Sequence, residues 1–140
     1  MSGGRPPAFL DTSYVVRYLV NDPPDMAQKA AEVIDGDETL ILSEIVLLET
    51  AYVLTSVYSV PRANIVDSLT ELVQRANLRL ASLPKASVLE ALQLCRSSGR
   101  VSFADALIWA QAVDRGAERI YAFDRRFPNR GVTIEGMRGA

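Results

Sequence analysis

The hydrophobic positions of the chain follow two alternating patterns. Short apolar runs, typical of buried strands, are separated by longer segments in which apolar residues recur at the spacing of one helix face. The runs predict strands over residues 8–10, 40–42, 78–80, 119–123 and 132–134. The periodic segments predict helices over residues 14–20, 24–34, 44–58, 62–76, 84–99 and 102–113. This alternation predicts an α/β fold with a mostly parallel central sheet of four or five short strands and helices on both faces.

The chain length indicates a single domain. With 140 residues, 49% of them hydrophobic and 23% charged, the chain resembles an ordinary globular domain. We expect a folded region over residues 8–135, with flexible ends over residues 1–7 and 136–140. No apolar run is long enough for a signal peptide or a membrane span. A lone cysteine, Cys95, lies in a helical segment and predicts a buried thiol, so we expect a cytoplasmic protein.

Composition excludes several kinds of catalysis. The chain contains no histidine, which rules out a histidine general base, a Ser-His-Asp triad and a histidine metal site. It also has no glycine-rich phosphate-binding string. Charge is distributed unevenly, because residues 1–60 carry a net charge of −6 and residues 96–140 a net charge of +3. The arginine-rich end could meet a polyanion, or it could be an ordinary solvated surface.

Four acidic residues occur in apolar surroundings, unlike most of the other acids. Asp11 and Asp124 each follow a predicted strand, while Glu49 and Asp105 lie within apolar helices. These neighbours predict partial burial, and a buried carboxylate needs a partner, a proton or a cation. Strand ends and helix starts also place all four at the edge where open α/β sheets bind ligands. Because an all-oxygen site suits Mg²⁺ or Mn²⁺, the four acids predict a metal site.

Each acid also has a structural interpretation. Asp11 could cap the first helix, and Ser102 with Asp105 matches a capping box. Glu49 could point to solvent, and Asp124 could be a turn residue.

The residue strings around these acids resemble the ordered motifs of PIN-domain ribonucleases. They are Phe9-Leu10-Asp11-Thr12-Ser13, Glu44-Ile45-Val46-Leu47-Leu48-Glu49, Phe103-Ala104-Asp105-Ala106-Leu107-Ile108 and Ala122-Phe123-Asp124-Arg125-Arg126-Phe127. A free-standing chain of this length is similar to the VapC toxins of bacterial toxin–antitoxin pairs. The resemblance implies cleavage of RNA phosphodiesters with Mg²⁺ or Mn²⁺, a homodimer, and inhibition by a VapB-type antitoxin.

The resemblance places the family's catalytic, metal-binding acids on Asp11, Glu49, Asp105 and Asp124, the residues that stood out from their surroundings. Thr12 and Ser13 stand where a hydroxyl could hold a water molecule or a phosphate oxygen, although both could also serve the helix start. Three arginines near the last acid are candidates for the RNA backbone, with a solvated surface as the alternative. They are Arg125, Arg126 and Arg130.

Several alternatives stay open at this stage. Ser102 and Arg126 stand where some relatives have further acids, so the site could take one metal ion or two. A non-catalytic PIN-like module that binds RNA or a partner is a second interpretation. A Mg²⁺-dependent phosphotransfer domain of the receiver or haloacid dehalogenase type is a third, although Ser13 stands where the dehalogenase motif needs a second aspartate.

Overall fold

The computed structural model describes residues 4–136, arranged as two compact units that meet in sequence between Ser82 and Leu83. Residues 1–3 and 137–140, which belong to the ends expected to be flexible, lie outside the described residues. Strands and helices alternate along the chain as expected. Their bounds differ from the sequence prediction mainly at the ends of elements.

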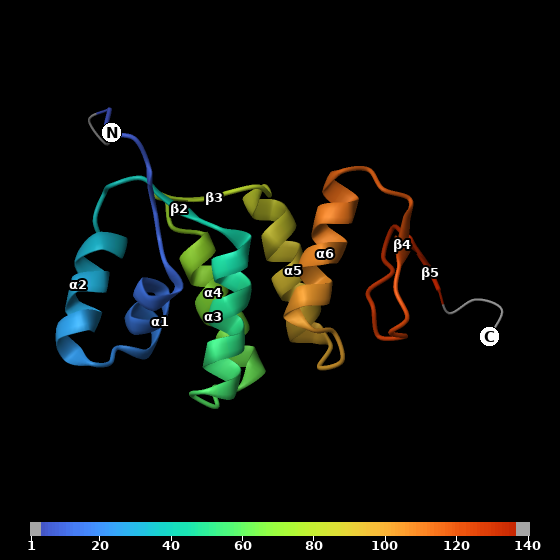
Figure 1. Ribbon diagram of the computed structural model, residues 1–140, viewed down its shortest axis with the longest axis horizontal. Helices are drawn as coiled ribbons and strands as arrows, with labels where there is room; N and C mark the ends of the chain where they lie inside the picture. The colour runs from blue at the N-terminus through green and yellow to red at the C-terminus, as the bar shows by residue number, and fades with distance from the viewer. Residues whose placement is uncertain (1–3, 137–140) are drawn as a thin grey trace. The chain divides into compact units, whose positions relative to one another are not determined.

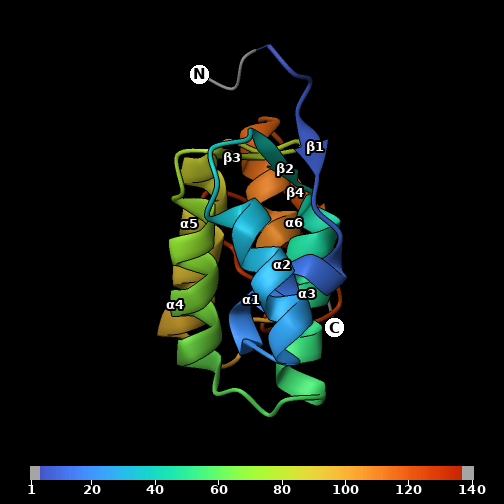
Figure 2. The ribbon, with the colours of Figure 1, turned by 90° about the vertical axis from the view of Figure 1, so that its left-hand side faces the viewer.

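The first unit contains a three-stranded parallel sheet in the order β1-β2-β3. Its elements are β1 (Ala8–Phe9), α1 (Thr12–Val20), α2 (Pro24–Ile34), β2 (Leu40–Leu42), α3 (Glu44–Ser56), α4 (Arg62–Val73) and β3 (Leu78–Leu80). In the register of the central strand, Leu40 pairs with Ala8 on one side and with Leu78 on the other. The four helices pack side by side below the strands (Figure 2).

The core of this unit comes from the apolar faces that the helical spacing predicted. Val15 of α1, Ile34 of α2, Leu47 of α3 and Leu69 of α4 are almost completely buried. At full burial each such side chain stabilises the fold by about 1.5–3 kcal/mol. All four helices begin after a residue that keeps the backbone extended, and in α3 the Ser43 hydroxyl also accepts a hydrogen bond from the Ile45 amide. The helices are therefore fixed at their starts by local chemistry and along their length by burial.

The second unit consists of two packed helices and a short parallel strand pair. Its elements are α5 (Lys85–Ser97), α6 (Phe103–Asp114), β4 (Arg119–Tyr121) and β5 (Thr133–Glu135). The helices α5 and α6 lie side by side, and α6 also contacts β4 (Figure 1). Cys95 of α5 is fully buried, as predicted. Gly116 ends α6 in the left-handed region at φ +73°, where a side chain would be strained.

The α/β class and the parallel pairing of strands are confirmed. The prediction of one central sheet of four or five strands is wrong in detail, because the described strands form one sheet of three and another of two. The reason lies in the pairing partners: Ile120 of β4 is in register with Ile134 of β5. The predicted 119–123 strand also ends early, at Tyr121, and the next two residues belong to the loop before β5.

Candidate functional site

Asp11 lies just beyond the carboxyl end of β1 and caps α1. Its Oδ2 accepts hydrogen bonds from the Ser13 amide at 3.0 Å and from the Ser13 hydroxyl at 2.6 Å. These bonds hold the pKa of Asp11 below its usual value. The capping interpretation is confirmed. A cap leaves the carboxylate anionic, and Asp11 Oδ1 takes no part in these bonds, so capping does not prevent it from binding a cation.

Glu49 joins the same group through Thr12. The Thr12 hydroxyl donates a hydrogen bond of 2.5 Å to Glu49 Oε1, which links the start of α1 to the middle of α3. Thr12 is buried, whereas Glu49 is exposed. The first unit therefore brings two of the predicted acids and both predicted hydroxyl residues close to the end of β1.

The predicted partial burial is wrong for Asp11 and Glu49, since both residues are exposed. Glu49 lies on a stripe of α3 with Ile45 and Tyr52, at positions that follow one another at helical spacing. That stripe is exposed throughout, with Ile45 77% and Tyr52 69% accessible. Apolar neighbours in sequence therefore did not indicate apolar neighbours in space, because α3 is apolar on its exposed face as well as its buried one.

Asp105 lies in the first turn of α6 and is half-buried. The Ser102 hydroxyl accepts a 3.0 Å hydrogen bond from the Asp105 amide, so Ser102 is the helix cap. The cap uses only the backbone of Asp105, whose carboxylate makes no hydrogen bond or ion pair within residues 4–136. An acid at this position interacts favourably with the helix dipole and stays available for a cation.

Asp124 follows β4, and its carboxylate is bound by Arg126. The Arg126 Nε donates to Oδ1 at 3.0 Å, Nη2 donates to Oδ2 at 2.9 Å, and the Arg126 amide donates to Oδ1 at 2.8 Å. These bonds hold the pKa of Asp124 below its usual range, and the same ion pair, with a smaller contribution from the charge of Asp105, raises the pKa of Arg126. The turn interpretation is correct in geometry, and both carboxylate oxygens already have a cationic partner.

The other two arginines are exposed. In the described part of the chain, neither Arg125 nor Arg130 forms an ion pair with a carboxylate, so both guanidinium groups can meet solvent or a phosphate. The Arg130 backbone has a separate role, because its carbonyl accepts a 2.7 Å hydrogen bond from Trp109 Nε1 of α6. This bond ties the loop between β4 and β5 to the helix that carries Asp105.

The four acids are divided between the units. Asp11 and Glu49 belong to the first unit and Asp105 and Asp124 to the second. Among the described residues, neither unit by itself gathers three or more acidic, cysteine or histidine side chains that could hold a metal ion. Each unit thus offers a pair of carboxylates. Their donor chemistry, all oxygen and mostly anionic, matches what Mg²⁺ and Mn²⁺ prefer.

Glu44 is an acid of this region that the sequence analysis did not single out. It is the first residue of α3 and only 7% exposed, and its two carboxylate oxygens accept hydrogen bonds from the Ser82 amide at 3.2 and 3.0 Å. The contact fixes the segment after β3 to the start of α3. The signal that could have found it is its position, since it comes two residues after a buried strand and in the first turn of a helix.

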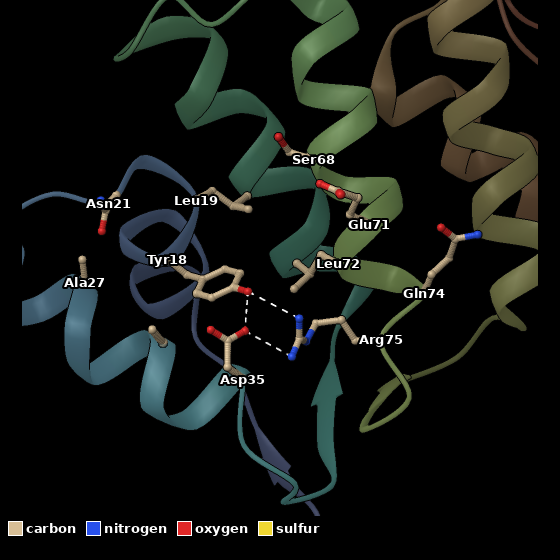
Figure 3. A pocket seen from close by; sticks show the side chains of 11 residues that line it. Tyr18, Leu19, Asn21, Ala27, Asp35, Ser68, Glu71, Leu72, Gln74 and Arg75 are labelled. Carbon is tan, nitrogen blue, oxygen red and sulfur yellow. Dashed lines mark hydrogen bonds and ion pairs between the residues drawn. The ribbon is translucent and has the colours of Figure 1, made fainter.

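A pocket of about 760 Å³ lies elsewhere in the first unit, lined from α1, α2 and α4. In Figure 3, Tyr18, Asp35 and Arg75 meet at one wall of it. The Tyr18 hydroxyl donates to Asp35 Oδ1 at 2.5 Å, and Arg75 Nη2 lies 3.1 Å from the same oxygen. None of the residues predicted for the site lines this pocket. The cluster ties three helix ends together and includes none of the four acids.

Tyr18 provides a pH-dependent test of this cluster. Burial, followed by the hydrogen bond to Asp35, raises the pKa of Tyr18 above its ordinary value. A raised pKa means that the contribution of Tyr18 to stability is complete below the unfolded pKa of about 10 and is lost as the pH rises through the folded pKa. We expect ultraviolet titration of tyrosinate to show one late-ionising group that is missing in Tyr18→Phe. A late step that persists in Tyr18→Phe would assign it to another tyrosine.

Comparison with known proteins identifies the family. The PIN domain family model matches residues 8–132, and the chain therefore belongs to the PIN domain family. Among solved structures, the chain is similar to Mycobacterium tuberculosis VapC20, described as a sarcin-ricin loop cleaving toxin. That match has 21% sequence identity and a TM-score of 0.42, and it covers 86% of this chain and 92% of VapC20. The curated proteins give no match. No helix within residues 4–136 is long and apolar enough to cross a membrane.

Proposed function

We propose that this PIN-domain chain is a divalent-metal-dependent endoribonuclease that hydrolyses RNA phosphodiesters. The observation that carries the proposal is the family match over residues 8–132, which spans all four acids in the order that the resemblance requires. Asp11 and Asp124 each lie just beyond a strand, Asp105 lies in the first turn of a helix, and Thr12 holds Glu49 close to Asp11.

In this proposal Asp11, Glu49, Asp105 and Asp124 hold Mg²⁺ or Mn²⁺. When bound, such a cation would supply an acidified water molecule and would neutralise charge on the phosphate. The protein itself fixes the ligands: Ser13 orients the Asp11 carboxylate and Thr12 orients Glu49. No histidine is present to act as a base, so activation of water would depend on the chemistry that a bound cation supplies. In-line attack by water leaves a 5′-phosphate and a 3′-hydroxyl.

We assign binding of the RNA backbone to exposed cationic groups close in sequence to Asp124. Arg125 and Arg130 are exposed and unpaired with acids in the described structure, which is what phosphate contacts require. Such contacts hold RNA without reading its sequence. Ser13 is a further candidate for a phosphate oxygen, because its hydroxyl is exposed beside Asp11.

The proposal extends to a cellular role as the toxin of a toxin–antitoxin pair. Support comes from the motif resemblance to VapC toxins and from the family match. The role includes a cytoplasmic homodimer that a VapB-type antitoxin inhibits.

Expression in a bacterial host tests the proposed role. Without a partner gene, induction of the chain is expected to arrest growth and to leave RNA fragments with 5′-phosphate ends. The matched control is the Asp105→Asn protein at equal soluble yield, which is expected to permit normal growth. Normal growth with the soluble unmodified chain, and intact RNA in those cells, would contradict the proposal.

A further inference from the structure

The Arg126 guanidinium binds the Asp124 carboxylate, which the proposed function assigns to a cation. Its Nε and Nη2 each donate to a different oxygen of Asp124, at 3.0 and 2.9 Å, and its amide adds a third bond at 2.8 Å. A two-pronged contact of this kind is more directional than a single ion pair and fixes the plane of the carboxylate. The side chains of Arg126 and Asp124 are 56% and 40% exposed, so a hydrated ion can approach the pair.

The contact also involves the charge of Asp105, the other predicted site acid of the second unit. The charge of Asp105 also acts on Arg126, which places the guanidinium within the electrostatic reach of both carboxylates. The positive charge of Arg126 therefore offsets part of the negative charge that would attract a divalent cation. A cation at Asp124 must share or displace the bonds that Arg126 makes.

We propose that Arg126 is a positioning residue that competes with the divalent cation for Asp124, holding this carboxylate in place and weakening cation binding at this end of the site. This inference rests on the proposed function, since it requires Asp124 to be a metal ligand. It also separates Arg126 from Arg125 and Arg130, with which the sequence groups it. Those two arginines have no acidic partner in the described structure, whereas the guanidinium of Arg126 is already bound.

Mn²⁺ binding to the full chain tests the inference without using activity. Electron paramagnetic resonance of free Mn²⁺ gives the affinity and the number of bound ions for the unmodified protein, Arg126→Gln and Arg125→Gln. Removing a positive charge in contact with a metal ligand is expected to tighten Mn²⁺ binding about tenfold in Arg126→Gln. The matched control Arg125→Gln loses the same charge from an exposed side chain that has no acidic partner, and screening by solvent and salt should limit its effect to less than about threefold.

The outcomes separate the inference from the proposed function. Selective tightening in Arg126→Gln supports the inference. Equal affinities in Arg126→Gln and Arg125→Gln would overturn it while leaving the proposed function intact. No Mn²⁺ binding by any of the proteins would overturn the proposed function, and the inference with it. If circular dichroism shows that Arg126→Gln is unfolded, Arg126→Lys replaces it. A single ammonium group cannot bind both oxygens of Asp124, so Mn²⁺ binding tighter than in the unmodified protein is again expected. Unchanged affinity in Arg126→Lys would overturn the inference.

Discussion

Replacing Asp105 with Asn is expected to lower RNA cleavage by a thousandfold or more while the fold is preserved. The amide keeps the shape of the side chain but removes the negative charge that a divalent cation needs, and loss of several kcal/mol of transition-state stabilisation corresponds to about three orders of magnitude in rate. The fold should survive because the Ser102 cap uses the Asp105 backbone amide, which the substitution leaves in place. Initial rates of cleavage with saturating Mn²⁺ give the measurement.

The control for this variant is Asp114→Asn. Asp114 is the last residue of the same helix, α6, and it is exposed. It therefore reports the effect of the same chemical change far from the start of the helix, and we expect cleavage within about twofold of the unmodified protein, as for a surface substitution away from special features. An active Asp105→Asn protein, or an equal loss in Asp114→Asn, would remove Asp105 from the proposed site.

The second large effect is a loss of stability, which we expect in Trp109→Ala. Trp109 is 3% exposed, and its Nε1 donates the 2.7 Å hydrogen bond to the Arg130 carbonyl. Truncation leaves a large cavity between α6 and the loop before β5, and it leaves that carbonyl without its donor. The free energy of unfolding should fall by about 3–5 kcal/mol. Because this is the only tryptophan of the chain, urea unfolding must be followed by circular dichroism rather than by fluorescence.

Trp109→Phe separates packing from the hydrogen bond. The phenyl ring keeps most of the apolar contacts but has no donor for the Arg130 carbonyl, so we expect a smaller loss, about 1–3 kcal/mol. A loss below about 1 kcal/mol in Trp109→Ala would show that the loop is not held by α6, since buried aromatic truncations ordinarily cost several times more.

The sequence predicted the order and type of the elements because their signals are local. Asp11 and Ser102 cap helices as expected, and the apolar spacing of α4 places Leu69 in the core. The division into two sheets was not predictable, because strand pairing depends on contacts between distant residues. The pairing of Ile120 with Ile134 leaves no trace in the spacing of either strand.

The candidate site shows the same division between local and distant information. Ser13 bonding to Asp11 follows from sequence neighbours, as does the turn that joins Asp124 and Arg126. The exposure of Glu49 did not follow, because α3 is apolar on the side that faces solvent as well as on the side that packs. Burial of Glu44 was missed for the opposite reason: its partner, Ser82, lies far along the chain.

The central claim is that carboxylates and a divalent cation cleave RNA. Its most direct test is incubation of the purified chain with a mixed RNA pool in Mn²⁺, with EDTA and the Asp105→Asn protein in parallel. We predict fragments with 5′-phosphate ends in Mn²⁺ alone, none with EDTA, and none with Asp105→Asn. Undiminished cleavage in EDTA, or by the Asp105→Asn protein, would contradict the account.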